Sequence, residues 1–563
     1  MPKVFKFRNE LTIALLAGLL FIPFLGGVHL FDWDEINFAE CAREMYINRD
    51  FGRVYIQFLP FWEKPPFFIW LQVASMAIFG VSDFAARFPN AICGVLTLVF
   101  LFRIGKKYHD ARFGWIWVLT YAGSVLPQLY FHSGIIDPWF NFLILIGLHY
   151  FFLYFQSRTT ASENQQALKF AGLSGLFLGL ALITKGPAAL LIFGLVVGIR
   201  WILLRFALFF KPLDLLAFFA GLSLFSLGWG LMETLRNGPW FITEFIRYNI
   251  RLFSTPDAGH GGFPGYHVVV LLFGCFPASF FFLTDLFRGK YSRDNPGEFR
   301  LWMHLLFWVV LVLFSVVQSK IVHYSSLCYF PLSFGAALAI NRLLTGEKRT
   351  PIWIMVLIGF VSLVLSTALF IFPSLTSHPE WIRPLLAKDP FAVANLETQI
   401  SWDGWEWLCG VWVLLVFAGF VYFQFQGAFW KSFQILFGGT ALSVVFILWG
   451  YIGRIEAFSQ GTIISFFESL QGEDAYILTY GYRSYAHVYY PRIQPGQKPQ
   501  LRDPEKYSES MDFWRDSLLR NPTDKPVYII TKINKKEGLD QYPELKLQWE
   551  KSGWSVWKKP AKP

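Results

Sequence analysis

Long apolar runs, separated by short loops that carry the charges, dominate the hydrophobic pattern of the chain. A helix needs about 20 apolar residues to cross the hydrocarbon core of a bilayer. The pattern therefore predicts an all-α integral membrane protein of about 13 transmembrane helices. The predicted spans lie near 11–30, 84–102, 113–131, 139–155, 170–184, 187–204, 213–233, 264–286, 301–317, 322–340, 352–373, 406–424 and 432–451.

The basic residues of the loops decide which side each loop occupies. The run Phe67 to Phe79 is too short to span and is interpreted as re-entrant or interfacial. With thirteen spans the basic clusters all fall on one side, which the positive-inside rule makes cytoplasmic. The amino terminus is then predicted to be cytoplasmic and the carboxyl terminus to lie outside. The clusters are Lys3, Lys6 and Arg8; Arg103, Lys106, Lys107 and Arg112; Arg200, Arg205 and Lys211; Arg288, Lys290, Arg293 and Arg300; and Arg342, Lys348 and Arg349.

Composition agrees with the membrane interpretation. The 563 residues are 54% hydrophobic and 16% charged, whereas a soluble protein carries nearer 25% charge. The net charge of +10 favours cytoplasmic loops over a nucleic-acid partner. Asp32, Trp33 and Asp34 follow the first run directly without a small-residue cleavage site, which predicts a membrane span rather than a signal peptide. The five cysteines imply no disulfide framework.

Residues 452–563 follow the last span and change in character. The stretches 475–480 and 526–531 are rich in β-branched and aromatic residues, as strands are, and the region 511–520 is helix-like. We therefore predict two parts: a transmembrane domain, 1–451, with catalytic outer loops 31–83, 132–138 and 235–263, and a soluble α/β domain, 452–563, on the outer face.

The isolated charges gather on that predicted outer face. They are Asp34 with Glu35, Glu63 with Lys64, Asp137, Lys185, Arg247 with Arg251, and Lys320. Charges at a membrane rim are costly and usually mark a site. Acids could orient or deprotonate a nucleophile while cations stabilise an anionic leaving group. At a membrane surface we expect that group to be a lipid phosphate, which Lys and Arg bind well.

Each of these residues also has a structural interpretation. Asp34, Glu35 and Asp137 could cap helices, and Lys185 and Lys320 could be lysines that anchor the ends of spans. Arg247 and Arg251, four residues apart, could form a solvated helix face. Glu63, His260 and His267 could bind a divalent metal ion (Zn, Mg or Mn), with plain loop structure as the alternative for the two histidines.

The outer-loop residues resemble the glycosyltransferases of the GT-C fold, in particular the lipid A aminoarabinose transferases within the protein O-mannosyltransferase superfamily. The resemblance covers roughly residues 10–340. It is carried by Asp34-Glu35, Ala42 to Met45, Glu63-Lys64-Pro65-Pro66, Trp70, Phe79-Gly80, Ala86-Arg87, Asp137, Thr184-Lys185-Gly186-Pro187, and Phe314-Ser315 through Lys320, Tyr324 and Pro331.

The resemblance implies transfer of a sugar from a polyprenyl monophosphate carrier, on the periplasmic face, with inversion at the anomeric carbon. It implies that Asp34 is the main catalytic acid and Asp137 a second one, and Glu35 is kept as a further candidate acid. Glu63 is similar to a residue near a bound metal. The phosphate ligands that it implies are Lys64, Lys185 and Arg251, with Arg247, Lys320 and Tyr324 as further candidates at the carrier or acceptor site.

One local departure concerns the arginine pair. The family often has Arg directly before Phe, but here Arg251 stands two residues before Phe253, which leaves the choice between Arg247 and Arg251 open. The loop Gly259 to His267 has no clear counterpart either, so the acceptor can differ from that of the family.

We therefore expect an enzyme of the bacterial inner membrane with a polyprenyl-phosphate sugar donor and a lipid acceptor such as lipid A. Asp34 would be the base for a hydroxyl acceptor, and would orient a phosphate acceptor or stabilise the sugar ring. Protein Ser/Thr is the alternative acceptor. The alternative of another class is a transporter or flippase of lipid-linked sugars, which would place charges along a path through the membrane.

Overall fold

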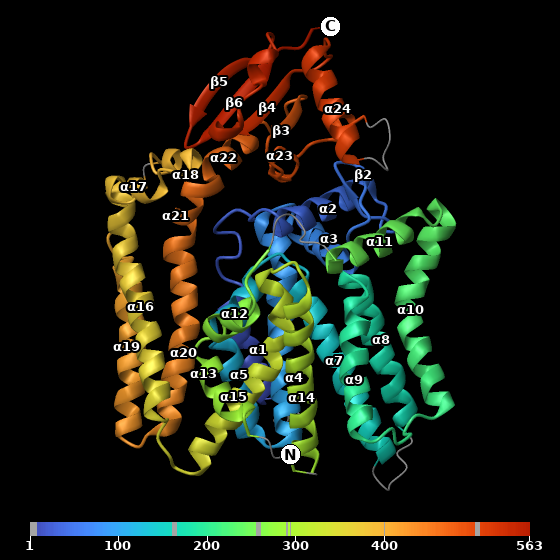
Figure 1. The fold of residues 1–563 in the computed structure, drawn as a ribbon, viewed down its shortest axis with the longest axis vertical. Coiled ribbons are helices and arrows are strands. Elements are labelled where there is room, and N and C mark those ends of the chain that lie inside the picture. The colour runs from blue at the N-terminus through green and yellow to red at the C-terminus, as the bar shows by residue number, and fades with distance from the viewer. Residues whose placement is uncertain are drawn as a thin grey trace.

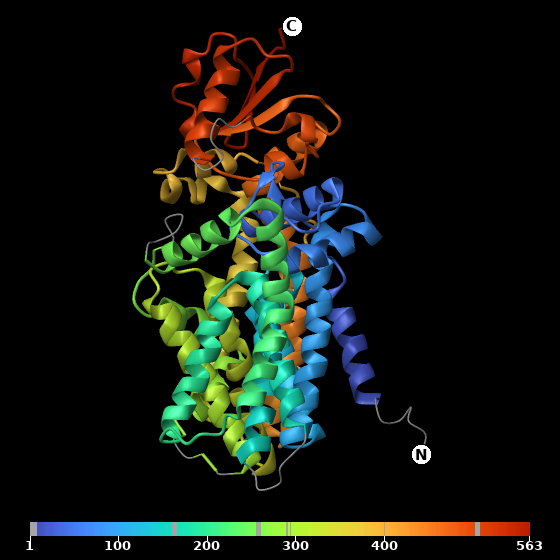
Figure 2. The same cartoon turned by 90° about the vertical axis from the view of Figure 1, so that its right-hand side faces the viewer.

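The computed structural model describes residues 8–159, 166–254, 261–288, 291–292, 294–398, 400–500 and 507–562, without the side chains of 252–254 and 507–509. A bundle of long, roughly parallel helices carries a small sheet domain at one end (Figure 1). The view turned by 90° shows the same two parts, with short helices between them (Figure 2). This arrangement confirms the predicted fold class.

Nine helices within the described ranges are long and apolar enough to cross a membrane, or ten if one bent pair counts as a span. The nine are α4 (Asp83–Tyr108), α7 (Asp137–Thr159), α8 (Ala167–Lys185), α10 (Pro212–Asn237), α14 (Asn295–Val316), η4 with α15 (Val322–Cys328, Tyr329–Thr345), α16 (Ile352–Ser377), α19 (Trp407–Phe425) and the run that starts with α20 (Phe429–Ile447). The bent pair is α12 (Tyr266–Gly274) and α13 (Ala278–Leu286), which meet at 120° around Pro277.

Every one of the thirteen predicted spans coincides with helix, but three of them, besides the bent pair, hold only short ones. These are α1 (Arg8–Phe21), α5 (Ala111–Ala122), which is followed by α6 (Val125–Leu129) and η2 (Tyr130–His132), and α9 (Ala188–Leu203). The first apolar run continues to Leu30, yet its helix ends at Phe21. An apolar run therefore predicts the presence of a helix more reliably than the residue at which that helix ends.

The far end of the bundle holds the predicted cytoplasmic loops. The loops after α4, α9, α13 and α15 all lie opposite the sheet domain (Figure 1). Asp285 forms ion pairs there with Arg300, His304 and Arg342. Because an unpaired buried charge is strongly destabilising, these pairs fix the helix ends on the side away from the sheet.

Short elements lie across the near end of the bundle. They are α2 (Asp34–Asn48), the hairpin of β1 (Tyr55–Ile56) and β2 (Leu59–Pro60), α3 (Phe67–Phe79) and α11 (Trp240–Ser254). Both views place them between the long helices and the sheet (Figures 1 and 2). The segment interpreted as re-entrant or interfacial is thus a short helix at the end of the bundle.

The last long helix does not stop at the predicted domain boundary of 452. It continues through two π-helical stretches, η6 (Leu448–Ile452) and η7 (Ala457–Gly461), with α21 (Gly453–Glu456) between them, and ends with α22 (Thr462–Ser469). Arg454 pairs with Asp403 and Glu406 on the way. The short elements η5 (Pro379–Trp381), α17 (Arg383–Leu386) and α18 (Pro390–Asn395) lie near this helix below the sheet (Figure 1).

The C-terminal domain is a four-stranded mixed sheet of order β3-β4-β6-β5. β3 (Tyr476–Tyr480) and β4 (Val527–Lys532) are parallel and coincide with the predicted strands 475–480 and 526–531, and β5 (Lys546–Lys551) and β6 (Trp554–Lys559) pair antiparallel. β5 forms an edge whose charged side chains discourage pairing with other chains. Around the sheet lie α23 (Ala486–Tyr489), η8 (Pro495–Gln497), α24 (Tyr507–Arg520), η10 (Ile533–Lys535) and η11 (Leu539–Gln541).

A buried ion pair fixes the first loop to the bundle. Arg87 of α4 donates to both carboxylate oxygens of Glu35 at 2.9 and 2.8 Å, and the backbone N–H groups of Phe31 and Gly134 donate to the same carboxylate. Burial by itself raises the pKa of Glu35, but the charge and hydrogen bonds of Arg87 outweigh it and lower the pKa. Glu35 therefore stays ionised and is fully engaged in holding the loop.

We expect Glu35→Ala to destabilise the folded protein by about 3–5 kcal/mol, because it leaves the Arg87 guanidinium buried without its partner. Thermal unfolding in detergent measures the loss. Glu35→Gln keeps one of the two acceptor oxygens that the backbone N–H groups of Phe31 and Gly134 use, so its stability should lie between that of the wild type and that of Glu35→Ala. A Glu35→Ala protein that unfolds like the wild type but transfers no sugar would instead support a catalytic role for Glu35.

A second contact joins the loop before α2 to the helix that leads to the sheet domain. His29 Nδ1 lies 2.6 Å from Glu456 Oε1, and His29 Nε2 lies 3.5 Å from Glu468. Burial lowers the pKa of His29, but the hydrogen bond and charge of Glu456, together with Asp83 and Glu468, raise it above the ordinary 6.5. The imidazolium is thus favoured in the folded state.

This pair should make stability depend on pH. A raised histidine pKa contributes stability that is complete below pH 6.5 and is lost as the pH rises through the higher pKa of the folded state. We expect the unfolding temperature to fall as the pH rises above about 6.5, and Glu456→Gln to flatten that fall. Glu468→Gln, at the longer distance, is the control and should change it less.

Candidate active site

Asp34 and Asp137, two of the acids that the sequence singled out, lie at helix N-termini on the sheet side of the bundle. Asp34 is the first residue of α2 and Asp137 the first of α7, where Pro138 occupies the next position. Carboxylates are favoured at the positive end of a helix, and proline is tolerated in its first turn. Asp34 Oδ2 lies 3.5 Å from Nε2 of His323, which belongs to η4.

Lys185 meets Asp137 from the opposite helix end. It is the last residue of α8, where a cation is favoured, and its Nζ donates to Asp137 Oδ1 at 2.5 Å. Gly186 follows with φ of 116°, in the region that favours glycine. A Cβ at Gly186 would lie 2.9 Å from Phe245 and 3.1 Å from Asn249 of α11. The glycine therefore lets α11 pass close to Lys185.

Lys64 completes the arrangement from the loop before α3. Its ammonium lies 5.9 Å from the ring centre of Phe38 and 5.6 Å from that of Tyr248. Burial alone would lower the pKa of Lys64, but Tyr248, Asp34 and Glu63 raise it well above its ordinary value. Lys64 is therefore held charged beside an aromatic wall.

Tyr324 and His323 lie between these groups. The Lys185 ammonium stands 5.3 Å from the centre of the Tyr324 ring. His323 is within electrostatic range of Asp137, Lys185, Asp34 and Lys64. We call the six residues Asp34, Lys64, Asp137, Lys185, His323 and Tyr324 the acid–cation cluster. Four separate segments of the first 185 residues and η4 thus converge at one point.

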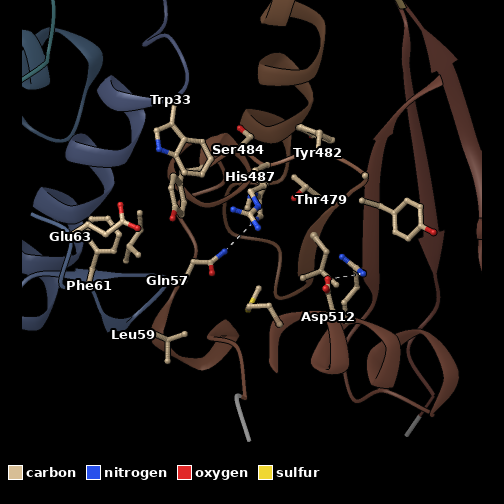
Figure 3. Close-up of a pocket in the computed structure, with 18 of the residues that line it drawn as sticks. Trp33, Gln57, Leu59, Phe61, Glu63, Thr479, Tyr482, Ser484, His487 and Asp512 are labelled. Atoms are coloured by element: carbon tan, nitrogen blue, oxygen red, sulfur yellow. Dashed lines mark hydrogen bonds and ion pairs between the residues drawn. The ribbon is translucent and has the colours of Figure 1, made fainter. Parts of the chain in front are cut away.

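A cavity of about 1130 Å³ lies next to this cluster, and Trp33, Glu63 and Tyr248, which are neighbours of Asp34 and Lys64, line it. Its walls come from the first outer loop, from α11 and from the C-terminal domain. The loop and α11 contribute Trp33, Gln57, Leu59, Phe61, Glu63, Glu244, Arg247, Tyr248 and Arg251, and the domain contributes Thr479, Tyr482, Ser484, Tyr485, His487, Asp512, Arg515 and Lys535. Figure 3 shows Glu63 and Phe61 on one side of this space and Thr479 and Asp512 on the other.

The two arginines of α11 differ in their surroundings. The side chain of Arg247 is 71% exposed and pairs with Glu244 in its own helix. The Arg251 guanidinium lies 5.4 Å from the ring centre of Tyr248, the same ring that Lys64 faces. The geometry thus links Arg251, rather than Arg247, to the acid–cation cluster.

Lys320 and Glu35 are two further predicted site residues that lie outside the cluster. The Lys320 ammonium donates to the carbonyls of Phe314, Ser315 and Val317 at 3.1, 2.6 and 2.6 Å. These are carbonyls at the end of α14, which a lysine can cap. Glu35 is engaged by Arg87 as described above. The structural interpretations of these two residues account for their contacts, and a role of either in binding or catalysis stays a prediction.

The predicted metal ligands do not form a recognisable centre. Among the described residues no group of three His, Cys, Asp or Glu side chains could hold a metal ion. His260 lies outside the described residues. His267 is buried next to Phe314, and the charge of Lys320 acts on it, which disfavours a cation there. Glu63 lines the cavity instead. The metal therefore stays a prediction.

Sequence reasoning missed His323, Tyr248 and the contribution of the C-terminal domain to the cavity. His323 stands three residues after Lys320 and directly before Tyr324, so the signal was present in a segment already singled out. Tyr248 lies between the two candidate arginines. The domain residues carried no comparable signal, because tertiary contact alone brings them to the cavity.

The arrangement is suited to displacement of an anionic group. Two carboxylates stand beside two ammonium groups, with Arg251 close by. Cations at this position can bind a phosphate and stabilise the charge that it gains on leaving, while a carboxylate that is not consumed by an ion pair can accept a proton or orient a nucleophile. Asp137 is paired with Lys185, which leaves Asp34 as the acid for that second task.

Comparison with known proteins gives consistent matches. The family model for dolichyl-phosphate-mannose-protein mannosyltransferases matches residues 63–229. The undecaprenyl phosphate-alpha-4-amino-4-deoxy-L-arabinose arabinosyl transferase of Edwardsiella ictaluri is 28% identical over 353 residues, which is 61% of this chain and 61% of that protein. The enzyme of the same name from Shewanella sediminis is 24% identical over 84% of this chain and 83% of its own length.

The solved structures agree over almost the whole chain. ArnT from Cupriavidus metallidurans, in a crystal structure bound to undecaprenyl phosphate, superposes with a TM-score of 0.76 and 18% identity, covering 99% of each chain. Its apo form gives the same TM-score, with 17% identity and 98% of each chain covered. The chain therefore has the fold of ArnT, and its resemblance to the GT-C aminoarabinose transferases, predicted from the outer-loop residues, is confirmed.

Proposed function

We propose that the protein is an inverting glycosyltransferase that moves a sugar from a polyprenyl phosphate carrier to a lipid acceptor such as lipid A. The observation that carries the proposal is the convergence of Asp34 and Asp137 with Lys64 and Lys185 next to the cavity. The names of the relatives point to 4-amino-4-deoxy-L-arabinose as the sugar and undecaprenyl phosphate as the carrier.

The cationic side of the cluster is assigned to the donor phosphate. Lys64 is held charged by its neighbours, and Arg251 shares the Tyr248 ring with it. Lys185 adds a third cation, oriented by Asp137 and next to Tyr324. Arginine and lysine are the usual phosphate ligands. Asp137 acts in this assignment by holding Lys185 rather than by exchanging a proton.

The reaction is a single displacement. An acceptor oxygen forms a bond to the anomeric carbon while the bond from that carbon to the phosphate oxygen breaks, and the electron pair leaves with the polyprenyl phosphate. If the acceptor is a hydroxyl, its proton goes to Asp34. If it is an ionised phosphate, Asp34 orients it or stabilises positive charge on the sugar ring. Phosphate is a good leaving group, so no general acid is needed.

The end of the bundle that carries the cavity is assigned to the periplasmic face of the bacterial inner membrane, with the amino terminus cytoplasmic. The basic loops gathered at the other end support this orientation. Protein Ser/Thr is the second acceptor class, because the family model matched by residues 63–229 describes protein mannosyltransferases. Mass spectrometry of lipid A and of envelope proteins from a deletion strain decides between the acceptors.

Asp34→Asn is expected to abolish transfer while the protein stays folded and inserted. The exchange keeps the shape of the side chain but removes its charge and basicity, and Asp34 is not part of a buried ion pair whose loss would unfold the loop. Transfer of sugar to lipid A in detergent, followed by mass spectrometry, measures the effect. Near wild-type activity in this variant would refute the assignment of Asp34.

Lys64→Met is expected to raise the KM for the lipid-linked donor about tenfold or more and to lower kcat, since it removes a charge–phosphate contact of about 1.4 kcal/mol or more. Lys320→Met is the matched control. Its ammonium caps α14, so that variant should lower the unfolding temperature and leave the donor KM unchanged. If the KM for the donor rises in Lys320→Met and not in Lys64→Met, then Lys320 is the phosphate ligand and the assignment of Lys64 is wrong.

A further inference from the structure

The two residues that precede Asp34 contact the C-terminal domain. The Trp33 and Tyr485 rings lie 4.7 Å apart between centres, at an angle of 47°. The carboxylate of Asp32 accepts hydrogen bonds from the Ser484 hydroxyl and the Tyr485 backbone N–H. Figure 3 shows Trp33 next to the turn that carries Ser484, at the edge of the cavity. A turn some 450 residues away in the chain thus touches the start of α2.

Further contacts tie the same domain segment to the same loop. The Tyr490 hydroxyl accepts from the Leu30 backbone N–H at 2.7 Å, and Arg43 Nη1 donates to the Ile493 carbonyl at 3.0 Å. Gln57 lies at the turn of the β1–β2 hairpin, and its Nε2 is 3.1 Å from Nε2 of His487 in α23 (Figure 3). These contacts reach the loop before α2, the middle of α2 and the hairpin after it.

The hydrophobic core is shared in the same way. One cluster of buried residues contains Leu30, Ile36, Phe38, Ala42 and Met45 from the first loop together with Ala486, Tyr489, Tyr490, Ile530 and Trp554 from the C-terminal domain. The domain also has a core of its own between its sheet and α24, and with that core alone it could move as a unit on a linker. A domain that completes the core of a catalytic loop cannot leave without disturbing that loop.

Asp34 itself has little to hold its side chain. Its ionic partner in the described part of the chain is His323, at 3.5 Å, which is longer than a strong hydrogen bond. The residue before it, Trp33, makes no side-chain cap to α2. The position of Asp34 therefore depends on its backbone, which Glu35 fixes from the membrane side and Trp33 from the domain side.

We propose that Ser484 and Tyr485 of the C-terminal domain are positioning residues that set the place of Asp34 through Asp32 and Trp33. We call these four residues the loop clamp. The proposal rests on the proposed function for its catalytic consequence, but the contact that it describes can be measured without it. The C-terminal domain is then a working part of the active site, beyond forming one wall of the cavity.

The clamp and the donor ligands lie on different sides of Asp34. Lys185 contacts Asp137 and Phe140 of α7. Lys64 contacts Phe38 of α2 and Tyr248 of α11. None of these residues belongs to the clamp, which faces the sheet. Loss of the clamp should therefore misplace Asp34 and leave the donor phosphate bound. A misplacement of about 1 Å can cost up to about 100-fold in rate, so the effect belongs in kcat and not in the KM for the donor.

The test uses the full-length protein in detergent with the variants Tyr485→Ala, Tyr485→Phe and Trp33→Ala. Tyr485→Ala and Trp33→Ala should each lower kcat per folded molecule about 10- to 100-fold with the donor KM within about twofold. Tyr485→Phe keeps the ring and should retain near wild-type activity. A variant that combines Trp33→Ala with Tyr485→Ala should be no slower than the slower of the two single variants, because both changes break the same contact between the two rings.

Asp474→Ala is the control, because Asp474 belongs to the same domain but does not line the cavity, and its 70% exposed side chain pairs with Lys525 at 2.7 Å. Such pairs contribute little, so kcat should not change. A Tyr485→Ala protein with kcat within twofold of the wild type per folded molecule overturns the proposal, and so does a loss that appears only as less folded protein.

Hydrogen–deuterium exchange of residues 30–38 gives a readout that does not need activity. We expect faster exchange there in Tyr485→Ala and no change in Asp474→Ala or Tyr485→Phe. If the wild type transfers no sugar to any acceptor, the proposed function fails, and the exchange result still decides the clamp. Unchanged exchange in Tyr485→Ala overturns the clamp even if the enzyme is active.

Discussion

The buried ion pair between Glu35 and Arg87 is the constraint on which the rest of the site depends. Successive residues of a helix point about 100° apart, so a side chain fixed inward at Glu35 directs Asp34, its neighbour, to another side. The pair also ties the start of α2 to α4, and Gly134 to the same carboxylate. Because Gly134 is close in sequence to Asp137, one carboxylate sets the positions of both loops that carry the candidate acids.

The electrostatic balance of the cluster follows from that placement. Asp137 and Lys185 neutralise each other at 2.5 Å, and both lie at helix ends whose dipoles favour their charges. Lys64 is kept charged by surrounding carboxylates and phenols, which do not form a tight ion pair with it. A site built in this way holds positive charge ready for a phosphate without leaving any buried cation uncompensated.

The parts of this arrangement that depend on composition and on loop order could be predicted from the sequence. Apolar runs located thirteen helical segments, and the basic loops sorted their ends, so the sequence alone placed Asp34, Lys64, Asp137 and Lys185 on one face. The end of α1 at Phe21 and the continuation of the last helix beyond 452 could not be predicted. The end of a helix depends on its caps and tertiary contacts, and not on hydrophobicity alone.

The contacts of individual charged side chains could not be predicted from the sequence either. Lys320 and Lys185 look alike in sequence, since each follows an apolar run, but Lys320 caps carbonyls at the end of the preceding helix α14 while Lys185 reaches Asp137. Likewise Glu35 and Asp34 are adjacent acids with different surroundings. A pattern of charges identifies a face of the molecule, and only the packing of that face shows which charges are already satisfied by the protein.

The distribution of paired charges also bears on the choice between an enzyme and a transporter. A carrier of lipid-linked sugars needs polar groups along a path through the membrane. In the described ranges the strong ion pairs divide between the two ends: Asp137 with Lys185 lies near the cavity, while Arg158 with Asp214, Arg200 with Glu298 and the Asp285 group lie at the other end. The large core between them consists mainly of buried aromatic and aliphatic side chains. A substrate held at the rim needs no such path, because its lipid chain stays in the bilayer while its phosphate meets the cations at the surface.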